Sequence, residues 1–213
     1  SDIYSWLHAL PVSSCGLRLD DEAVRVAIGL RLGTPLCAEH TCNCGAWVDC
    51  MGTHGLSCKL GTGRLARHQQ LNDLVWRALE RASIPSCREP RNLLRDSELC
   101  PDGLTLIPWK EGKCLTWDVT VADTFAATYV SATSVKAGEA AARLAANKRD
   151  KYEEITHTHL FCPITVETMG PVEDEGRDLL SAIGHLVTKI TGDPRETSFL
   201  FQRLSVIIQR GNA

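Results

Sequence analysis

The stretch CPDGLTLIPWKEGKCLTWDVTV, residues 100–121, decides the predicted fold. Two runs of strand-forming residues flank Pro108–Gly112, whose proline and glycine suit the turn of a hairpin. The stretch therefore predicts two neighbouring strands, at about residues 100–107 and 113–121.

Each of these two strands contains one aspartate. Side chains alternate faces along a strand, so Thr116, Asp118 and Thr120 share the face opposite to Trp117. An aspartate is costly to bury without a partner, and pairing of the strands would bring Asp102 and Asp118 together at one edge of the sheet. Two converging carboxylates form a hard-oxygen site for Mg²⁺ or Mn²⁺, and such a site suits phosphodiester hydrolysis.

The flanking sequence predicts an α/β domain, because the order of elements is helix, three strands, helix and strand. Apolar residues recur at three- and four-residue spacing in the first segment that we expect to be helical, and the second has one apolar face. The expected helices lie at 2–36, 64–84, 134–156, 174–190 and 196–209, and the further strands at about 86–90 and 160–169. We expect three regions: a helical lead-in at 1–36, a metal-binding segment at 37–63, and a core with C-terminal helices at 64–213.

Length, composition and charge limit the class of protein. A chain of 213 residues, 44% of them hydrophobic, can bury a full core without disulfides. A formal net charge of −3 gives no global basic field, so any contact with nucleic acid must depend on local patches. No apolar run of about 20 residues and no charged-then-apolar leader is present, so we expect no membrane partner. Ser1 replaces a start methionine, and we expect the chain to be a segment of a longer protein.

Five of the ten cysteines lie within residues 37–63, where apolar periodicity is absent. Three thiolates and one imidazole can bind zinc in a tetrahedron, and a metal can order a short loop without a core. Cys37, His40 and Cys50 are also in reach, so the ligand set stays open. Reduced cysteines that act as small hydrophobic residues are the alternative. The four expected ligands of this structural zinc knuckle are Cys42, Cys44, His54 and Cys58.

The order of elements, with a Pro-Asp pair at Asp102 and Asp118 on the next strand, resembles the core of PD-(D/E)xK nucleases. Thr120 stands where that family has its lysine, so the cation must come from elsewhere. The long helix that precedes the last strand offers Lys148 and Lys151, which are three residues apart and share one face. A solvated helix face is the alternative for these lysines.

The order of all the motifs narrows this resemblance. Over about residues 37–170 the chain is similar to the C-terminal restriction-like endonuclease module of site-specific non-LTR retrotransposons, in which a zinc knuckle precedes the nuclease. The motifs follow one another as the Cys/His knuckle, Arg67-His68 at a helix start, Glu89-Pro90, Pro101-Asp102, Asp118 and Lys148-x-x-Lys151-Tyr152.

The resemblance implies a catalytic role for five of these residues. Asp102 and Asp118 would bind the catalytic Mg²⁺ or Mn²⁺. Lys148 or Lys151 would stabilise the transition state or position the water, with Tyr152 beside them. We expect Lys148 to be the more important lysine, because Lys151 lies farther along a helix that leaves the site.

Further charged residues have both a functional and a structural interpretation. Glu89 is a third candidate for the catalytic metal site, or a surface residue before a proline. Glu167 could reach the site or, as we expect, pair with a lysine. Basic residues could hold DNA phosphates or be solvated. The basic candidates are Arg64, Arg67 and His68 at a helix start, and Arg88, Arg91 and Arg95 beside Glu89.

These features together predict a divalent-metal-dependent endonuclease domain that cuts DNA. The resemblance implies two partners, DNA and the reverse transcriptase portion of the same longer protein, and a reducing, nuclear location. The rival is a catalytically inactive nucleic-acid-binding module with the same fold and zinc knuckle. A third alternative, a zinc-stabilised interaction domain, would make the two aspartates incidental.

Overall fold

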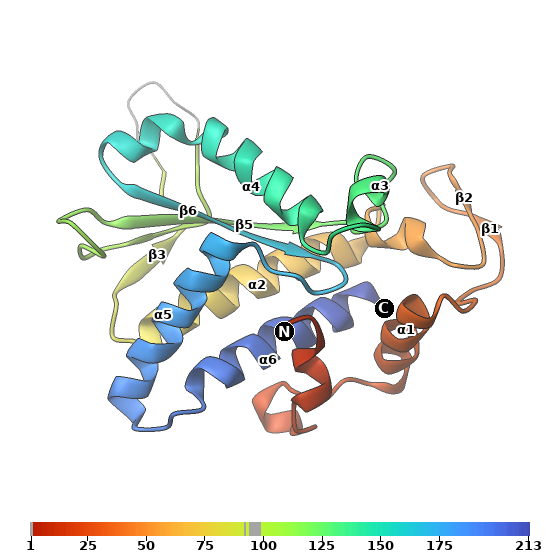
Figure 1. Ribbon diagram of the computed structural model, residues 1–213, viewed down its shortest axis with the longest axis horizontal. Helices are drawn as coiled ribbons and strands as arrows, with labels where there is room; N and C mark the ends of the chain where they lie inside the picture. The colour runs from red at the N-terminus through yellow and green to blue at the C-terminus, as the bar shows by residue number, and fades with distance from the viewer. Residues whose placement is uncertain (1, 92, 94–98) are drawn as a thin grey trace.

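The predicted hairpin lies at the centre of a four-stranded sheet in the computed structural model, which describes residues 2–91, 93 and 99–213 (Figure 1). The sheet order is β3-β4-β5-β6, with antiparallel pairing from β3 to β5 and parallel pairing of β5 with β6. The mixed α/β class is therefore confirmed. The strands are β3 (Ser86–Arg88), β4 (Gly103–Thr105), β5 (Leu115–Ala122) and β6 (Leu160–Glu167).

The register of β4 against β5 fixes the position of the two aspartates. Gly103 lies opposite Trp117, and a Cβ atom on Gly103 would overlap the indole ring, so this position requires glycine. Continuing this antiparallel register by one residue brings Asp102 opposite Asp118. The predicted meeting of the two residues at the end of β4 follows from this pairing.

Helices cover both faces of the sheet (Figure 1). The helix α4 packs on β5 and β6 from one side, whereas α2 and α5 pack on the other, with α6 beyond them. The apolar face of β5, with Leu115, Trp117 and Val119, points into the main core. The helices are α1 (Asp21–Leu32), α2 (Thr62–Arg81), α3 (Val130–Thr133), α4 (Glu139–Lys151), α5 (Asp174–Thr191) and α6 (Glu196–Asn212).

Two predicted helices are shorter in the structure. The lead-in at 2–36 contains only one α-helix, α1, preceded by the 3-10 turns η1 (Asp2–His8) and η2 (Ser13–Cys15). The predicted helix at 134–156 begins only at α4, because Gly138 adopts a left-handed conformation with φ of 89°. After Lys151 it gives way to the 3-10 turn η4 (Glu153–His157).

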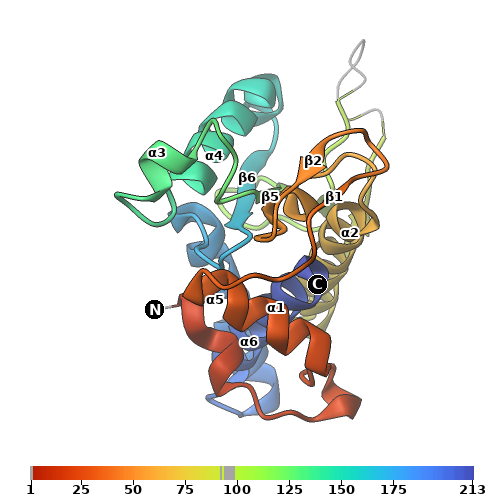
Figure 2. The same cartoon turned by 90° about the vertical axis from the view of Figure 1, so that its right-hand side faces the viewer.

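The lead-in packs against the C-terminal helix α6, so segments from the two ends of the sequence are in contact (Figure 2). The backbone N–H of Trp6 donates to the Ser205 hydroxyl on α6 at 3.1 Å. Trp6, Leu17 and Ala27 form a small apolar cluster with Val206. None of the helices in the described ranges is both long enough and apolar enough to cross a bilayer.

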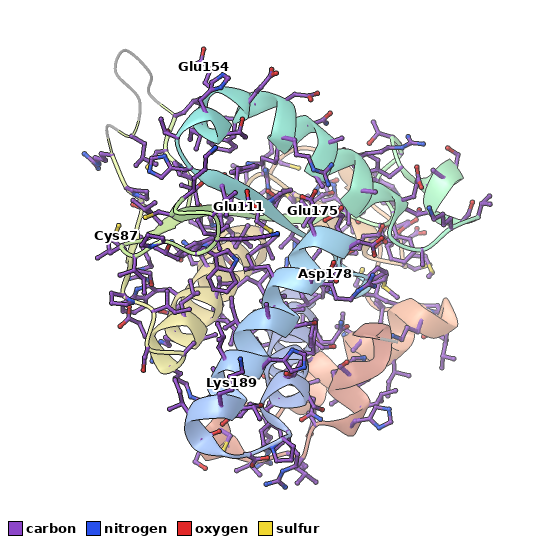
Figure 3. The ribbon with its side chains drawn as sticks, turned by 60° about the vertical axis from the view of Figure 1, so that its left-hand side comes forward. Cys87, Glu111, Glu154, Glu175, Asp178 and Lys189 are labelled. Carbon is purple, nitrogen blue, oxygen red and sulfur yellow. The ribbon has the colours of Figure 1, made fainter. Side chains whose placement is uncertain are left out.

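Buried and exposed carboxylates hold α4 in place over the sheet. Glu167, at the end of β6, is fully buried and accepts hydrogen bonds from the backbone N–H groups of Ala140 and Ala141. The expectation that Glu167 pairs with a lysine is wrong: its charge compensates the unpaired N–H groups of the helix start. Arg149 joins α4 to Glu175 in the first turn of α5 (Figure 3).

Candidate functional site

Asp118 is the centre of a polar cluster between β5 and α4. Its side chain is only 6% exposed, and Lys148 Nζ lies 2.7 Å from its Oδ1 atom. The Tyr152 hydroxyl donates to Oδ2 at 2.8 Å, and the Thr120 hydroxyl donates to Oδ1 at 3.3 Å. The helix therefore brings a cation to the carboxylate, whereas Thr120 on the same strand contributes only a hydroxyl.

Asp102 lies beside this cluster and is held by the backbone of β5. Its Oδ2 atom accepts from the Val119 N–H at 2.6 Å and lies 3.0 Å from His68 Nε2. The hydrogen bond with Asp102 raises the pKa of His68, although burial of the ring opposes this shift. Within the described part of the chain, the Oδ1 atom of Asp102 has no hydrogen-bond partner. That oxygen is free to bind another group.

Lys148 and Lys151 differ in what they contact. Lys151 lies 4.7 Å from the ring centroid of Tyr152 and 3.3 Å from its hydroxyl, and it forms no ion pair within the described residues. Tyr152 is buried, and its burial together with the charge of Asp118 raises the pKa of its hydroxyl. Tyr152 therefore stays protonated and donates to Asp118, whereas Lys148 is the cation in contact with that carboxylate.

A cleft of about 460 Å³ opens beside Lys148, between the start of α2 and the strand β5. Basic side chains dominate its polar wall, so the cleft attracts anions next to the two carboxylates. The side chains that line it include Lys59, Arg64, Leu65, His68, Val119, Thr120 and Lys148.

The candidates on and after β3 differ in how near they lie to the two aspartates. Glu89 is exposed, with a left-handed φ of 49°, and its backbone N–H donates to the Asp102 carbonyl at 3.0 Å, so it lies next to Asp102, although the described residues show no contact of its carboxylate with either aspartate. Arg88 stacks on the Trp76 ring, 4.8 Å from its centroid, and pairs with Asp73. Arg91 is exposed. Arg95 lies outside the described residues.

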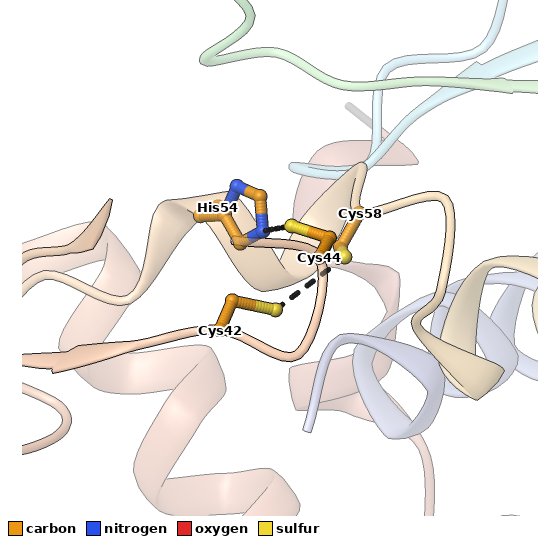
Figure 4. Close-up of side chains that lie close together, drawn as sticks. All are labelled: Cys42, Cys44, His54 and Cys58. Atoms are coloured by element: carbon orange, nitrogen blue, oxygen red, sulfur yellow. Dashed lines mark hydrogen bonds between the residues drawn. The ribbon is translucent and has the colours of Figure 1, made fainter. Parts of the chain in front are cut away.

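Four of the predicted zinc ligands converge at one point (Figure 4). Their ligand atoms all lie within 4.8 Å of one another, and the Sγ atoms of Cys42 and Cys58 are 3.7 Å apart. A tetrahedral zinc with Zn–S bonds of about 2.3 Å requires sulfur atoms about 3.8 Å apart, so the group could hold a metal ion. The four residues are Cys42, Cys44, His54 and Cys58.

Two short elements supply these ligands. Cys42 and Cys44 follow β1 (His40–Thr41) in the loop that leads to β2 (Trp47–Val48), and His54 and Cys58 belong to η3 (Thr53–Leu56) and the residues after it. The alternatives left open by the sequence, Cys37, His40 and Cys50, do not belong to this converging group. The Cys37 thiol donates to the Asp49 carbonyl, and the His40 ring contacts the Ala38 carbonyl.

Arg67 connects this knuckle to the core, so the prediction that it contacts phosphate is wrong. Its side chain is buried, and burial lowers the pKa of the guanidinium. The guanidinium donates to the carbonyl of Leu56, and also at 2.8 Å to the Gly211 carbonyl and the Asn212 side chain. Arg64, one helical turn earlier, is exposed and lines the cleft instead.

Replacing Arg67 with alanine is expected to lower the free energy of unfolding by about 2–4 kcal/mol, because buried carbonyls would lose their donor. Urea unfolding measures the change. The matched control is Arg64→Ala, which is exposed and is expected to change stability by less than about 0.5 kcal/mol. Equal effects of the two substitutions would contradict the buried role of Arg67.

Sequence reasoning missed Asn72, which holds the strand that carries Asp102. Asn72 is buried, and its amide donates to the Asp102 carbonyl at 3.3 Å and accepts from the indole N–H of Trp117 at 2.9 Å. Its position four residues after His68 was the available signal, because such residues share a helix face.

Comparisons with protein families and with curated proteins assign no function to these residues. No protein-family model matches the chain, and a comparison with curated proteins gives no significant match. The interpretation therefore depends on the geometry of two clusters: the Cys₃His group, and the ion pair of Lys148 with Asp118 next to Asp102.

Proposed function

We propose that this chain is the divalent-metal-dependent endonuclease domain of a retroelement protein and hydrolyses phosphodiester bonds of DNA. The contact of Lys148 Nζ with Asp118 Oδ1, at 2.7 Å and at the wall of an open cleft, carries the proposal. Lys148, on α4, supplies the positive charge that Thr120 cannot supply. In a nucleus, the cut would give the reverse transcriptase portion of the same protein a primer.

The donor set of the site suits a hard cation. Two carboxylates, from Asp102 and Asp118, are a usual protein contribution to a Mg²⁺ site, in which water and substrate oxygens complete the coordination. The free Oδ1 atom of Asp102 supports this assignment. The ion would activate water and neutralise charge on the phosphate.

The surrounding side chains have roles that follow from their contacts. The Lys148 ammonium stabilises the negative charge that builds on the scissile phosphate, since a fixed cation in a site of low exposure acts strongly. Tyr152 orients Asp118, and His68 orients Asp102. Arg64, in the wall of the cleft, binds a phosphate of the same strand.

We propose that the Cys₃His group holds a structural zinc. Three thiolates and one imidazole are a typical structural donor set, and all four coordination positions are then occupied by the protein. The ion would join the β1–β2 loop to the start of α2 and take no part in hydrolysis.

A plasmid-nicking assay tests the proposed activity. We expect supercoiled DNA to become open circles with Mg²⁺ or Mn²⁺ and to remain intact when EDTA is present, because the chemistry requires the ion. Adding excess Mg²⁺ to the EDTA sample should restore nicking. Absence of metal-dependent nicking, by protein shown to bind DNA, would reject the endonuclease proposal.

Replacing Lys148 with alanine is expected to slow nicking by about 100-fold or more, because an electrostatic donor at the reacting phosphate is lost. Lys151→Ala is the matched control, since it removes the same charge from the same helix and leaves Asp118 paired. Rates are measured by single-turnover cleavage, with melting temperatures as a check on folding. Full activity of Lys148→Ala would remove this residue from the mechanism.

A catalytically inactive DNA-binding module is the second candidate, and one observation favours it. Protein donors already contact both oxygens of Asp118, namely Lys148 and Thr120 on Oδ1 and Tyr152 on Oδ2. A metal ion would have to share or displace these donors. This candidate predicts salt-dependent DNA binding that Mg²⁺ does not convert into nicking.

A further inference from the structure

A second opening, of about 660 Å³, lies between α2 and α6 and is lined by more basic than acidic side chains. Asp73 and Glu196 are its two carboxylates. We call this opening the arginine groove. Its basic residues are Arg77, Arg81, Arg203 and Arg210.

Ion pairs neutralise only half of this positive charge. Arg77 pairs with Asp73 at 2.7 Å, and Arg81 pairs with Glu196 at 2.7 Å. Arg203 forms no ion pair within the described part of the chain. Two of the four arginines therefore remain uncompensated.

Arg210, the second uncompensated arginine, has neutral partners. Its guanidinium donates to the carbonyls of Gly16 and Arg18, which orient it without cancelling its charge. An oriented guanidinium loses little freedom when it binds an anion, and its planar donors match a phosphate. The groove therefore favours a ligand that carries several phosphates.

The arginine groove continues toward the candidate active site. Gln70 and Asp73 line both this groove and a neighbouring hollow of about 730 Å³, whose walls include His68 and Arg88. His68 in turn contacts Asp102. The hollow also holds two carboxylates: Arg88 pairs with Asp73, whereas the exposed Glu89 lines the same wall.

The length of this path suits one DNA strand. His68 and Arg81 are 13 residues apart on α2, which corresponds to about 20 Å along the helix. One strand of B-DNA advances about 3.4 Å along the duplex axis per phosphate, so a path of this length parallel to that axis covers about six nucleotides.

We propose that the arginine groove binds the phosphodiester backbone of DNA about six nucleotides from the bond that is cut. This inference deepens the proposed function and depends on it for the position of the cut. The two uncompensated arginines give affinity for phosphates without preference for a base sequence. Because the groove continues along α2 into the hollow beside His68, it also sets the direction in which the DNA leaves the active site.

The test compares two double variants that remove the same charge. Arg77→Gln/Arg203→Gln alters the groove, whereas Arg143→Gln/Lys189→Gln alters exposed cations elsewhere. Arg143, like Arg77, pairs with an acidic residue four positions away, and Lys189 lies at the end of α5 (Figure 3). Binding to a duplex of about 20 base pairs is measured by fluorescence anisotropy at several salt concentrations without Mg²⁺.

We expect the groove variant to bind about tenfold more weakly at 0.1 M salt. Its log–log salt slope should fall by about 0.9 for the phosphate contact of the uncompensated Arg203, and by up to about 1.8 if Arg77 exchanges Asp73 for a second phosphate. The control variant should stay within about twofold, with both melting temperatures unchanged. Unchanged affinity and slope of the groove variant would overturn the proposal, as would selective binding of an acidic peptide in place of DNA. If the groove variant binds DNA more weakly but the wild-type protein does not nick it, only the endonuclease proposal is rejected. If the wild-type protein nicks DNA but the groove variant binds it as tightly as the wild type, only the proposal for the groove is rejected.

Discussion

Replacing Asp118 with asparagine is expected to reduce nicking by at least about 1000-fold, because the variant loses both a metal ligand and the anion that positions Lys148. Asparagine keeps the size of the side chain and can still accept the hydrogen bond from Tyr152. The fold is therefore expected to survive. Single-turnover cleavage of plasmid DNA with saturating Mg²⁺ measures the loss.

The Asp118 variant also separates catalysis from binding. Removing an anion cannot weaken the attraction for phosphate, so DNA affinity is expected to stay the same or to rise. Asp102→Asn should lose activity in the same way, whereas Asp150→Asn, which alters an exposed carboxylate on α4, should not. If Asp118→Asn cuts at the wild-type rate, the active site lies elsewhere in the molecule.

The hairpin could be predicted from sequence because its signals are local. Alternation along β5 separates an apolar face, with Trp117, from a polar face, with Asp118, and only one of these faces can enter the main core. The antiparallel register then places Asp102 opposite Asp118. The strand limits differ from the prediction: β4 contains only Gly103–Thr105 of the predicted 100–107. Pairing with neighbouring strands decides where a strand ends, and that information is not local.

The roles of single charged residues depended on contacts distant in sequence. Arg67 is a basic residue at the start of a helix just after the knuckle, and this position suggested phosphate binding. Its hydrogen-bond acceptors instead include the carbonyl of Gly211, 144 residues later in the sequence. Glu167 caps α4, which begins 28 residues before it. Helical periodicity put Lys148 and Lys151 on one face, but only the rotation of α4 over β5 determines which of them reaches Asp118.

Removing the proposed zinc is expected to destabilise the whole domain, because the knuckle is packed against the rest of the chain. Cys58 is buried, and Leu56, between two ligands, packs with Val26 and Leu30 and accepts from Arg67. Loss of the ion frees this loop and leaves Arg67 without one of its acceptors. We expect Cys58→Ser to lose at least about 4 kcal/mol, which lowers the melting temperature by about 10 °C in a chain of this size.

Elemental analysis beside the melting curves distinguishes a structural from a catalytic zinc. Wild-type protein and Asp118→Asn should each contain about one zinc per chain, whereas Cys58→Ser should contain little. Cys15→Ser, which alters an exposed cysteine outside the group, is the matched control and should keep both zinc and stability. A zinc-free chain with the wild-type melting temperature would contradict the assignment. Zinc lost on replacing Asp118 would instead mean that the carboxylates hold it, since the Cys₃His group leaves no coordination position for that residue.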